Sequence, residues 1–195
     1  MRKLVLVIGC LIVACWALTS AAQTTTPRVS MSGGTMEIKP DPWAAWRYLL
    51  GEWVGVGTGT PGEGTGGFTF KFDLDSNVLV RRSYAEYPAT KDRPAFRHDD
   101  MMIVYPGTDT GAAAPCQAIY FDNEGHVIRY ATEFSPDRKL LTFLSEPSQP
   151  GPRFRFTYEN LSADTLGIKF DIAPPDKPDA FSTYITAKAA RETTK

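Results

Sequence analysis

The chain has 195 residues and a nearly balanced charge, with 21 basic against 22 acidic side chains. Charges of both signs are interspersed and there is no basic stripe, which excludes binding of nucleic acid through a charged face. This length suits one domain with a substantial hydrophobic core.

The first residues have the pattern of a targeting segment. Arg2 and Lys3 precede an apolar run at 4–18, and small residues follow at 20–22. This order is typical of a secretory signal peptide, here residues 1–22. The apolar run is shorter than the roughly 20 residues of a membrane span. We therefore expect an exported protein, periplasmic or secreted, with no transmembrane span in the mature chain.

Cysteine offers an alternative reading of the same segment. The run Ile12-Val13-Ala14-Cys15 is similar to the lipobox of bacterial lipoproteins, which would anchor the chain through a lipid on Cys15. Against this reading, Cys15 comes early and the apolar run continues beyond it. Cleavage after Ala22 would leave Cys116 as a single cysteine, which excludes an intramolecular disulfide. It would also remove two basic residues and leave a net charge of −3.

The segment 23–40 is rich in Thr, Ser, Gly and Pro and shows no apolar periodicity. Such a composition is typical of a flexible tether. We expect the folded domain to span 41–195.

A helix is predicted at the start of this domain. Asp41 suits the N-cap and Pro42 the first helical position, where its missing N–H costs nothing. Tryptophans and leucines then give one apolar face, and Gly51 ends a helix of two or three turns. Tryptophans clustered in this way are typical of a segment that seals one end of a β-barrel.

About ten short segments follow, each closed by Gly, Pro, Asn or Asp. Several alternate apolar with polar residues, as Phe68, Phe70 and Phe72 do, which is typical of a sheet with one buried face. The predicted strands are 52–59, 67–74, 78–87, 100–106, 116–122, 126–134, 140–146, 153–159, 165–173 and 181–191.

The fold class that these segments predict is all-β. Closing the sheet removes its exposed edges and its wet apolar face. We therefore expect a single antiparallel up-and-down β-barrel of about 8 to 10 strands, with the short N-terminal helix plugging one end. Glycines at 51, 55, 57 and 59 would permit the sharp coiling that closure needs.

The stretch 49–53 contains Gly51 and Trp53 in a Gly-x-Trp signature. It resembles the signature with which lipocalins and other members of the calycin superfamily begin their barrel. In that group a basic residue near the end of the last strand packs over the tryptophan, and the resemblance implies this role for Arg191.

The wider pattern of glycines and strands also resembles nitrobindin-type haem-binding barrels and secreted bacterial lipocalin-like proteins. Nitrobindin-type barrels hold haem through a histidine near the C-terminus. This chain has only His98 and His126, and neither lies in the last predicted strand. We therefore expect no cofactor, with haem held by His126 as the alternative.

The strand predicted at 78–87 carries an arginine on each face, so one of them must point inward. We take the face with Arg82, Tyr84 and Glu86 as the interior one. Burying these charges requires a partner or a ligand. Two outcomes stay open, of which the first is favoured: an Arg82–Glu86 ion pair that fixes the barrel, or a polar floor that orients a ligand.

Other candidates for the interior are aromatic. Tyr120 and Tyr130 lie on segments that we predict to form a hairpin, and they would add hydroxyl groups to the polar cluster. Phe70 belongs to the apolar face of its strand. Together with Arg82, Tyr84 and Glu86, these three residues form the predicted ligand-binding set.

Catalytic and metal signatures are weak. His98 stands beside two aspartates in the charged loop 88–99, but adjacent residues of an extended chain point apart and a metal needs further ligands. No serine lies in a Gly-x-Ser-x-Gly elbow, and Cys116 has no nearby base, so it is expected to be a small apolar strand residue. We predict no metal site and no catalytic residue.

The sequence therefore predicts an exported β-barrel that binds a small hydrophobic or amphipathic molecule in its interior. Three alternatives stay open: a filled structural or envelope-associated barrel, a haem-binding barrel, and an enzyme with a polar site at the barrel mouth. That enzyme would use Arg82, Tyr84, Glu86 or His98. The oligomeric state is open.

Overall fold

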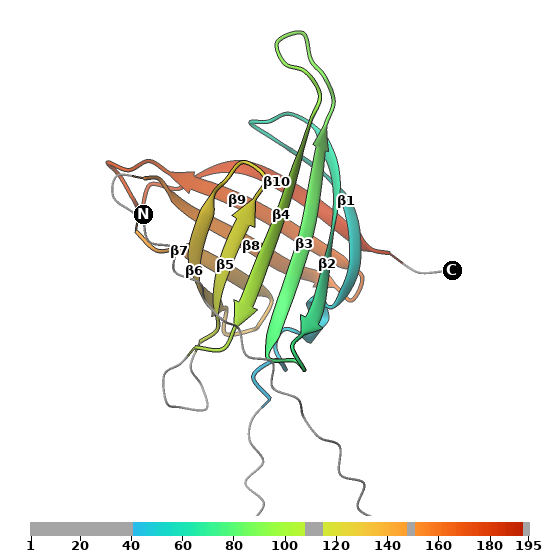
Figure 1. The fold of residues 1–195 in the computed structure, drawn as a ribbon, viewed down its shortest axis with the longest axis vertical. Helices are drawn as coiled ribbons and strands as arrows, with labels where there is room; N and C mark the ends of the chain where they lie inside the picture. Colours follow the sequence, from blue (N-terminus) through green and yellow to red (C-terminus); the bar gives the residue numbers. More distant parts are fainter. Residues whose placement is uncertain (1–40, 108–114, 148–150, 193–195) are drawn as a thin grey trace, which may run out of the picture. The chain divides into compact units, whose positions relative to one another are not determined.

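The computed structural model describes residues 41–107, 115–147 and 151–192. The expected signal peptide and tether lie outside these ranges. Within them the chain is all-β, and ten antiparallel strands form one closed barrel (Figure 1). The fold class predicted from the sequence is confirmed in this respect.

Each strand pairs with its neighbours in sequence, and β1 pairs with β10 to close the barrel. This is the up-and-down order that short connections favour. The strands are β1 Gly51–Gly59, β2 Gly64–Asp73, β3 Val78–Tyr87, β4 Phe96–Tyr105, β5 Gln117–Asp122, β6 Val127–Phe134, β7 Leu140–Ser145, β8 Arg153–Ser162, β9 Thr165–Ala173 and β10 Ser182–Arg191.

The predicted N-terminal helix is wrong. The segment before β1 forms turns and one short 3₁₀ helix, η1 (Arg47–Leu49), and the described residues contain no α-helix. Trp43, Trp46 and Leu49 stand three residues apart and are all buried. The N–H of Trp46 donates to the carbonyl of Trp43 and that of Leu49 to the carbonyl of Trp46, at 2.9 and 3.0 Å, so tight turns of three residues replace the four-residue hydrogen bonds of an α-helix.

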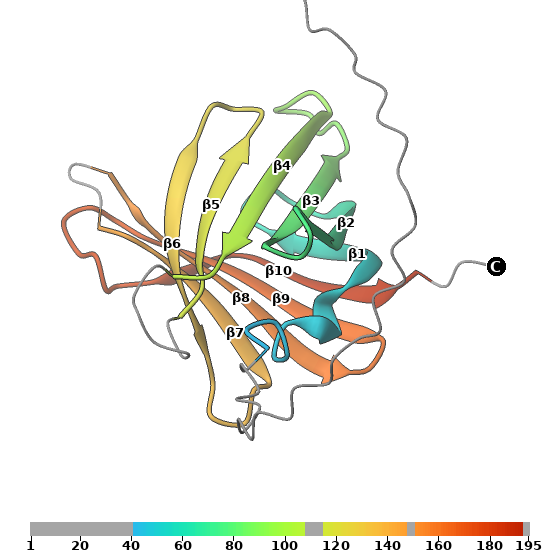
Figure 2. The same cartoon turned by 60° about the horizontal axis from the view of Figure 1, so that its bottom comes forward.

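The segment containing η1 lies across the lower opening of the barrel in Figure 2. Trp46 packs edge-on against Phe134 and Phe143, with ring centroids 5.2 and 5.9 Å apart. Its neighbour Trp43 donates its indole N–H to the carbonyl of Ser76, in the turn between β2 and β3, at 2.7 Å. The buried aromatic side chains thus cover the core at this end without an α-helix.

The Gly-x-Trp signature lies next to the end of the last strand. Trp53 is opposite Arg191 in the β1–β10 register, and the Arg191 guanidinium carbon lies 4.2 Å from the ring centroid. Arg191 also donates to the carbonyls of Tyr48 and Leu50. The arginine therefore joins β10 to the segment before β1 and covers the tryptophan ring.

The β2–β3 turn sets which side of β3 faces inward. Leu74, Asp75 and Ser76 all have positive φ, between 49° and 65°. The turn pairs Asp73 with Val78, so Phe70 is opposite Arg81. Because directly opposite residues of antiparallel strands share a face, Arg81 lies on the same side of the sheet as the buried Phe70.

The β3–β4 hairpin is longer than predicted, since β4 begins at Phe96 instead of residue 100. Tyr87 and Phe96 stack with ring centroids 4.6 Å apart. The Arg93 guanidinium lies 4.2 Å from the Phe96 ring centroid and donates to the carbonyl of Pro61, in the β1–β2 loop, at 2.8 Å. Arg93 therefore links the two hairpin tips beside the upper opening.

Candidate functional site

The structure reverses the predicted orientation of β3. Arg82 and Glu86 are exposed, whereas Arg81 is only 6% exposed. The interpretation of Arg82, Tyr84 and Glu86 as an interior cluster is therefore wrong. Arg81 is the arginine that the register turns inward.

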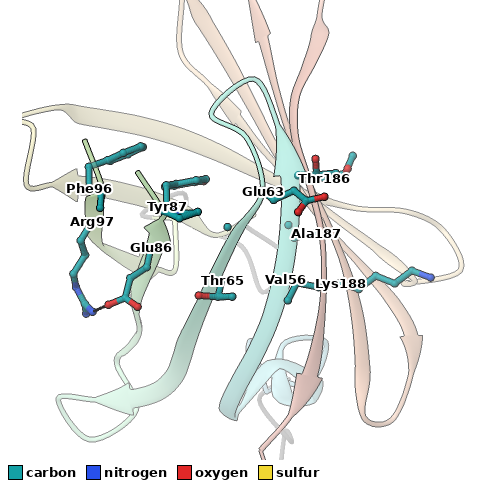
Figure 3. A pocket seen from close by; sticks show the side chains of 15 residues that line it. Val56, Glu63, Thr65, Glu86, Tyr87, Phe96, Arg97, Thr186, Ala187 and Lys188 are labelled. Atoms are coloured by element: carbon teal, nitrogen blue, oxygen red, sulfur yellow. Dashed lines mark hydrogen bonds and ion pairs between the residues drawn. The ribbon is translucent and has the colours of Figure 1, made fainter. Parts of the chain in front are cut away.

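Arg82, Tyr84 and Glu86 lie on the outer face of β3, although Tyr84 also borders the interior cavity. Glu86 pairs with Arg97 at 2.6 Å, and the Arg97 guanidinium lies 4.4 Å from the Tyr84 ring centroid. Figure 3 shows Glu86 and Arg97 meeting on this face. The predicted Arg82–Glu86 ion pair does not form, because Arg97 is directly opposite Glu86 across the β3–β4 pair.

Arg81 is the centre of a buried polar cluster inside the barrel. It donates to Asp100 Oδ1 at 2.6 Å and to the Ser83 hydroxyl at 2.9 Å. Its guanidinium carbon lies 5.1 Å from the Phe156 ring centroid and 5.6 Å from that of Phe68. Arg81, Ser83 and Asp100, with these two rings, are called the floor cluster here.

His98 and Tyr120 stand above the floor cluster. His98 Nε2 is 2.9 Å from the Tyr120 hydroxyl, and His98 Nδ1 is 2.9 Å from Glu124 Oε1. Burial raises the pKa of Tyr120 well above its ordinary range, so the phenol keeps its proton. The simplest arrangement has Tyr120 donating to Nε2 while Nδ1–H donates to Glu124.

His126 belongs to a separate pair beside this cluster. Its Nδ1 lies 2.8 Å from Asp122 Oδ2, and its backbone N–H donates to Asp122 Oδ1 at 2.9 Å. Burial acts to raise the pKa of Asp122, but the hydrogen bonds from His126 and from the Glu124 backbone prevail and lower it. Asp122 is therefore an ionised carboxylate that holds the imidazole in one orientation.

The remaining predicted residues all lie on the inner side of the barrel. Tyr130 is 3% exposed, and its ring meets Tyr120 edge-on at 6.4 Å between centroids. Phe70 is fully buried and packs against Phe68 and Tyr158. Tyr120 and Tyr130 line the interior cavity, whereas Phe70 lies in the packed core.

That cavity occupies the upper part of the barrel and has a volume of about 370 Å³. Arg81, Ser83 and Asp100 of the floor cluster contribute to its lining, as do His98 and His126. Most of the remaining wall is apolar or aromatic and comes from every strand except β7. Its larger members are Phe68, Tyr87, Phe96, Met102, Tyr120, Ile128, Tyr130, Phe154, Phe156, Ile168, Phe170, Ile172, Tyr184 and Ile185.

The lower part of the barrel is filled by side chains. Phe70, Leu79, Phe143 and Tyr158 are fully buried there, together with Trp53 at 1% exposure. Burial raises the pKa of the Tyr158 phenol far above its ordinary range, so it stays neutral. The interior thus has a packed half and a hollow half, and we call the hollow half the cup.

A second, more open hollow adjoins the cup and is seen in Figure 3. It shares Gly57, Gly64, Tyr87, Phe96 and Ala187 with the cup lining. Gly57 of β1 is directly opposite both Gly64 of β2 and Ala187 of β10. The shared residues place this hollow next to the mouth of the cup.

The described residues contain no group of three or more His, Cys, Asp or Glu side chains that would hold a metal ion. Cys116 is buried and unpaired, and burial raises the pKa of its thiol. No helix in the ranges that the structure covers is long and apolar enough to cross a membrane.

Sequence reasoning missed Arg81, Ser83, Asp100 and Glu124. The length of the turn between β2 and β3 was the signal that would have identified Arg81. A four-residue turn at 74–77 pairs Phe70 with Arg81 and puts Arg81 on the phenylalanine side. The position of Asp100 depends on the register of β4, and that of Glu124 on the turn between β5 and β6. The alternation of apolar and polar residues specifies neither.

Comparison with known proteins identifies the fold. No protein-family model matches the sequence, and a search of curated proteins found no match. The crystal structure of Rv2717c from M. tuberculosis has 13% sequence identity and a TM-score of 0.57, over 79% of this chain and 99% of that chain. This likeness shows that the two chains share a fold, the closed ten-strand antiparallel barrel.

Two further solved structures are more distant. The S-type phycobiliprotein lyase CPES from Guillardia theta has 7% identity and a TM-score of 0.48, over 77% of this chain and 92% of that one. A de novo designed fluorescence-activating β-barrel has 11% identity and a TM-score of 0.39, over 76% of this chain and 97% of that chain.

Proposed function

We propose that the protein is a binding barrel that holds a small hydrophobic or amphipathic molecule in its cup. The observation that carries this proposal is the 370 Å³ cavity, which is walled mostly by aromatic and aliphatic side chains, with the floor cluster and two histidine–carboxylate pairs as its polar groups. Small-molecule sites have this character: about 300 to 1,000 Å³, mostly apolar, with a few placed polar groups.

Apolar burial supplies a large part of the free energy that such binding requires. Burying roughly 400 Å² of apolar ligand surface contributes about 10 kcal/mol gross at about 25 cal/mol per Å². A micromolar dissociation constant requires about 8 kcal/mol net. The packed lower half supplies a rigid base, so little of the gross energy is lost in ordering the site.

The alternative of a filled structural barrel is less well supported. A filled barrel has large side chains meeting across its axis along its whole length. Here Phe70, Phe143 and Tyr158 meet in the lower half, whereas the upper half is hollow.

The test is binding of N-phenyl-1-naphthylamine, a neutral aromatic probe that fluoresces in apolar surroundings. We expect saturable binding to the purified protein. Ala187→Trp places a large ring in the cup and should weaken probe affinity at least about tenfold, whereas Thr186→Trp, on the neighbouring outward position, should leave it unchanged. Absence of saturable binding, or equal effects of the two variants, would contradict the proposal.

We further propose that the protein is exported, through cleavage after Ala22, with a lipid anchor at Cys15 as the alternative. Mass spectrometry of the protein from its own host separates the two. A mature mass beginning at Gln23 supports export by a cleaved signal, a diacylglycerol adduct on Cys15 supports the anchor, and an uncleaved chain contradicts both.

Haem is a second candidate ligand, for one specific reason. Asp122 holds Nδ1 of His126, the arrangement that often orients a metal-ligating imidazole and leaves Nε2 to bind. His98 is unsuited to this role because both of its ring nitrogens are engaged. A shift of the haemin Soret band on mixing with the protein, lost in His126→Ala and retained in His98→Ala, would support this candidate, and an unshifted band would remove it.

A further inference from the structure

Asp100 leaves one carboxylate oxygen without a partner inside the cup. Its side chain is only 7% exposed, and Oδ1 accepts a hydrogen bond from Arg81. Oδ2 receives no hydrogen bond from any residue in the described ranges, and His98 Nε2 lies 3.9 Å from it. This oxygen borders the cavity and is not sealed in the core, so it can accept a hydrogen bond from whatever occupies the cup.

The neighbouring side chains do not supply that donor. His98 Nε2 already faces the Tyr120 hydroxyl, and Nδ1 faces Glu124. Arg81 uses one terminal nitrogen for Asp100 Oδ1 and the other for Ser83. Since Asp100 lines the cavity, its donor comes from the contents of the cup, either water or a bound molecule that takes the place of water.

The charge of the cup points in the same direction. Among the described lining residues on the inner faces of the strands, Arg81 is the single permanent cation; its terminal nitrogens hold Asp100 and Ser83, while its Nε has no partner in the described residues. Three carboxylates line the cavity: Asp100, Asp122 and Glu124. Lys188 is exposed on the outer side of β10, opposite Val56. An anionic ligand would therefore lose its hydration without gaining a free cation.

The aromatic walls complete the argument. Phe154, Phe170 and Tyr184 line the cavity in addition to the two rings of the floor cluster. Aromatic faces attract organic cations, and carboxylates attract their N–H groups. Both features favour a ligand with a positively charged nitrogen over a ligand with a carboxylate.

We propose that the cup selects amphipathic molecules whose polar end is a protonated amine, which donates to Asp100 Oδ2 while the apolar part contacts the aromatic walls. This inference rests on the proposed binding function and names its ligand class. A charge-assisted hydrogen bond of this kind contributes about 1.5 to 3 kcal/mol, or at least about tenfold in affinity.

The experiment compares dodecylamine with dodecanoate, which carry the same alkyl chain and opposite head charges at pH 7.5. Each competes with N-phenyl-1-naphthylamine on the purified protein below its micellar concentration. We expect dodecylamine to displace the probe at least about tenfold more effectively. Equal or stronger displacement by dodecanoate overturns the inference and leaves the binding function standing. Failure of all three compounds to bind, checked by calorimetry, overturns both.

Variants test the assignment to Asp100. Asp100→Asn should reduce the preference for the amine to less than about threefold, whereas Asp99→Asn, on the outer side of the same strand, should preserve it. Because Asp100→Asn leaves Arg81 without its carboxylate, the double variant Arg81→Met with Asp100→Asn is measured as well. A full preference in a folded Asp100 variant would overturn the role of Asp100.

Discussion

At the scale of single residues, the most consequential contact is the ion pair between Arg81 and Asp100. Both side chains are only 7% exposed. Removing a charge from water costs several kcal/mol, and the pair recovers this cost only through close contact and further hydrogen bonds. Ser83 supplies one such bond, and the Phe68 and Phe156 rings cover the guanidinium. The pair is therefore sensitive to the loss of either partner.

Arg81→Met is expected to lower the free energy of unfolding by about 3 to 5 kcal/mol, because it leaves Asp100 as an isolated buried charge. Urea denaturation measures this change. Arg82→Met, at the adjacent exposed position, should change it by less than about 0.5 kcal/mol. The double variant Arg81→Met with Asp100→Leu should recover most of the loss, and a double variant as unstable as the single one would contradict this account.

Asp171 belongs to the outer wall and joins three strands. Arg155 of β8 donates two hydrogen bonds to its Oδ2, at 2.9 and 3.0 Å, and Thr183 of β10 donates to Oδ1 at 2.9 Å. Burial acts to raise the pKa of Asp171, but the hydrogen bonds from Arg155, Thr183 and Lys169 prevail and lower it. The ionised form is thus favoured by folding.

A lowered folded pKa stabilises the protein above the unfolded pKa of about 3.9, and this contribution disappears as pH falls through the folded value. We expect the stability difference between the native protein and Asp171→Asn to be largest at pH 6 and to shrink towards pH 3. Urea denaturation at several pH values measures it. Asp179→Asn, an exposed control, should differ by less than about 0.5 kcal/mol throughout. A difference independent of pH would refute the assignment.

At the scale of strands, the glycines of β1 allow close approach to β10. A Cβ built on Gly55 would lie 2.1 Å from the carbonyl oxygen of Lys188, and one on Gly59 would lie 2.0 Å from that of Tyr184. Real Cβ atoms do not come so close to a backbone atom. The two strands are therefore able to close the barrel in this geometry only because these side chains are absent.

Gly55→Ala is accordingly expected to force β1 and β10 apart and to cost about 1 to 3 kcal/mol of stability, the usual range for overpacking. Thermal unfolding followed by circular dichroism checks this. Thr58→Ala, at an exposed position of the same strand, is the control and should leave the midpoint nearly unchanged. An unaltered midpoint in Gly55→Ala would show that the seam between the strands relaxes freely.

The sequence predicts the strands better than it predicts the site. Alternation of apolar residues and turn signals located all ten strands, most of them within a few residues. The inward side of β3 was missed because both of its faces carry an arginine, so polarity alone did not decide the register. The start of β4 was missed because Arg97, His98 and Asp99 have the composition of a loop. In the structure, outer-wall ion pairs accommodate Arg97 and Asp99, and His98 lines the cup.

The segment before β1 illustrates a different limit. Its apolar residues fit an α-helix by composition, yet the spacing of Trp43, Trp46 and Leu49 matches the 3₁₀ period. Tertiary packing against Phe134 and Phe143 decided between the two periods, and no local pattern records those contacts.

At the scale of the whole molecule, one closed sheet surrounds two different interiors. Strand pairing continues all the way around the barrel, but the lower half encloses packed side chains and the upper half encloses a cavity. Stability in proteins is distributed according to such packing. The lower half is the part on which the closed sheet depends, and the upper half is free to adapt to its contents.

The packed lower half has a consequence for the opening of the sheet. Backbone amides of the same strand should exchange with deuterium at different rates, because the end beside Leu79 and Phe143 opens only with global unfolding while the end beside the cavity opens locally. Exchange followed by mass spectrometry should show slow peptides around the lower ends and faster ones around the mouth, and saturating ligand should slow only the latter. Uniform protection along β3 would mean that the barrel opens as one cooperative unit.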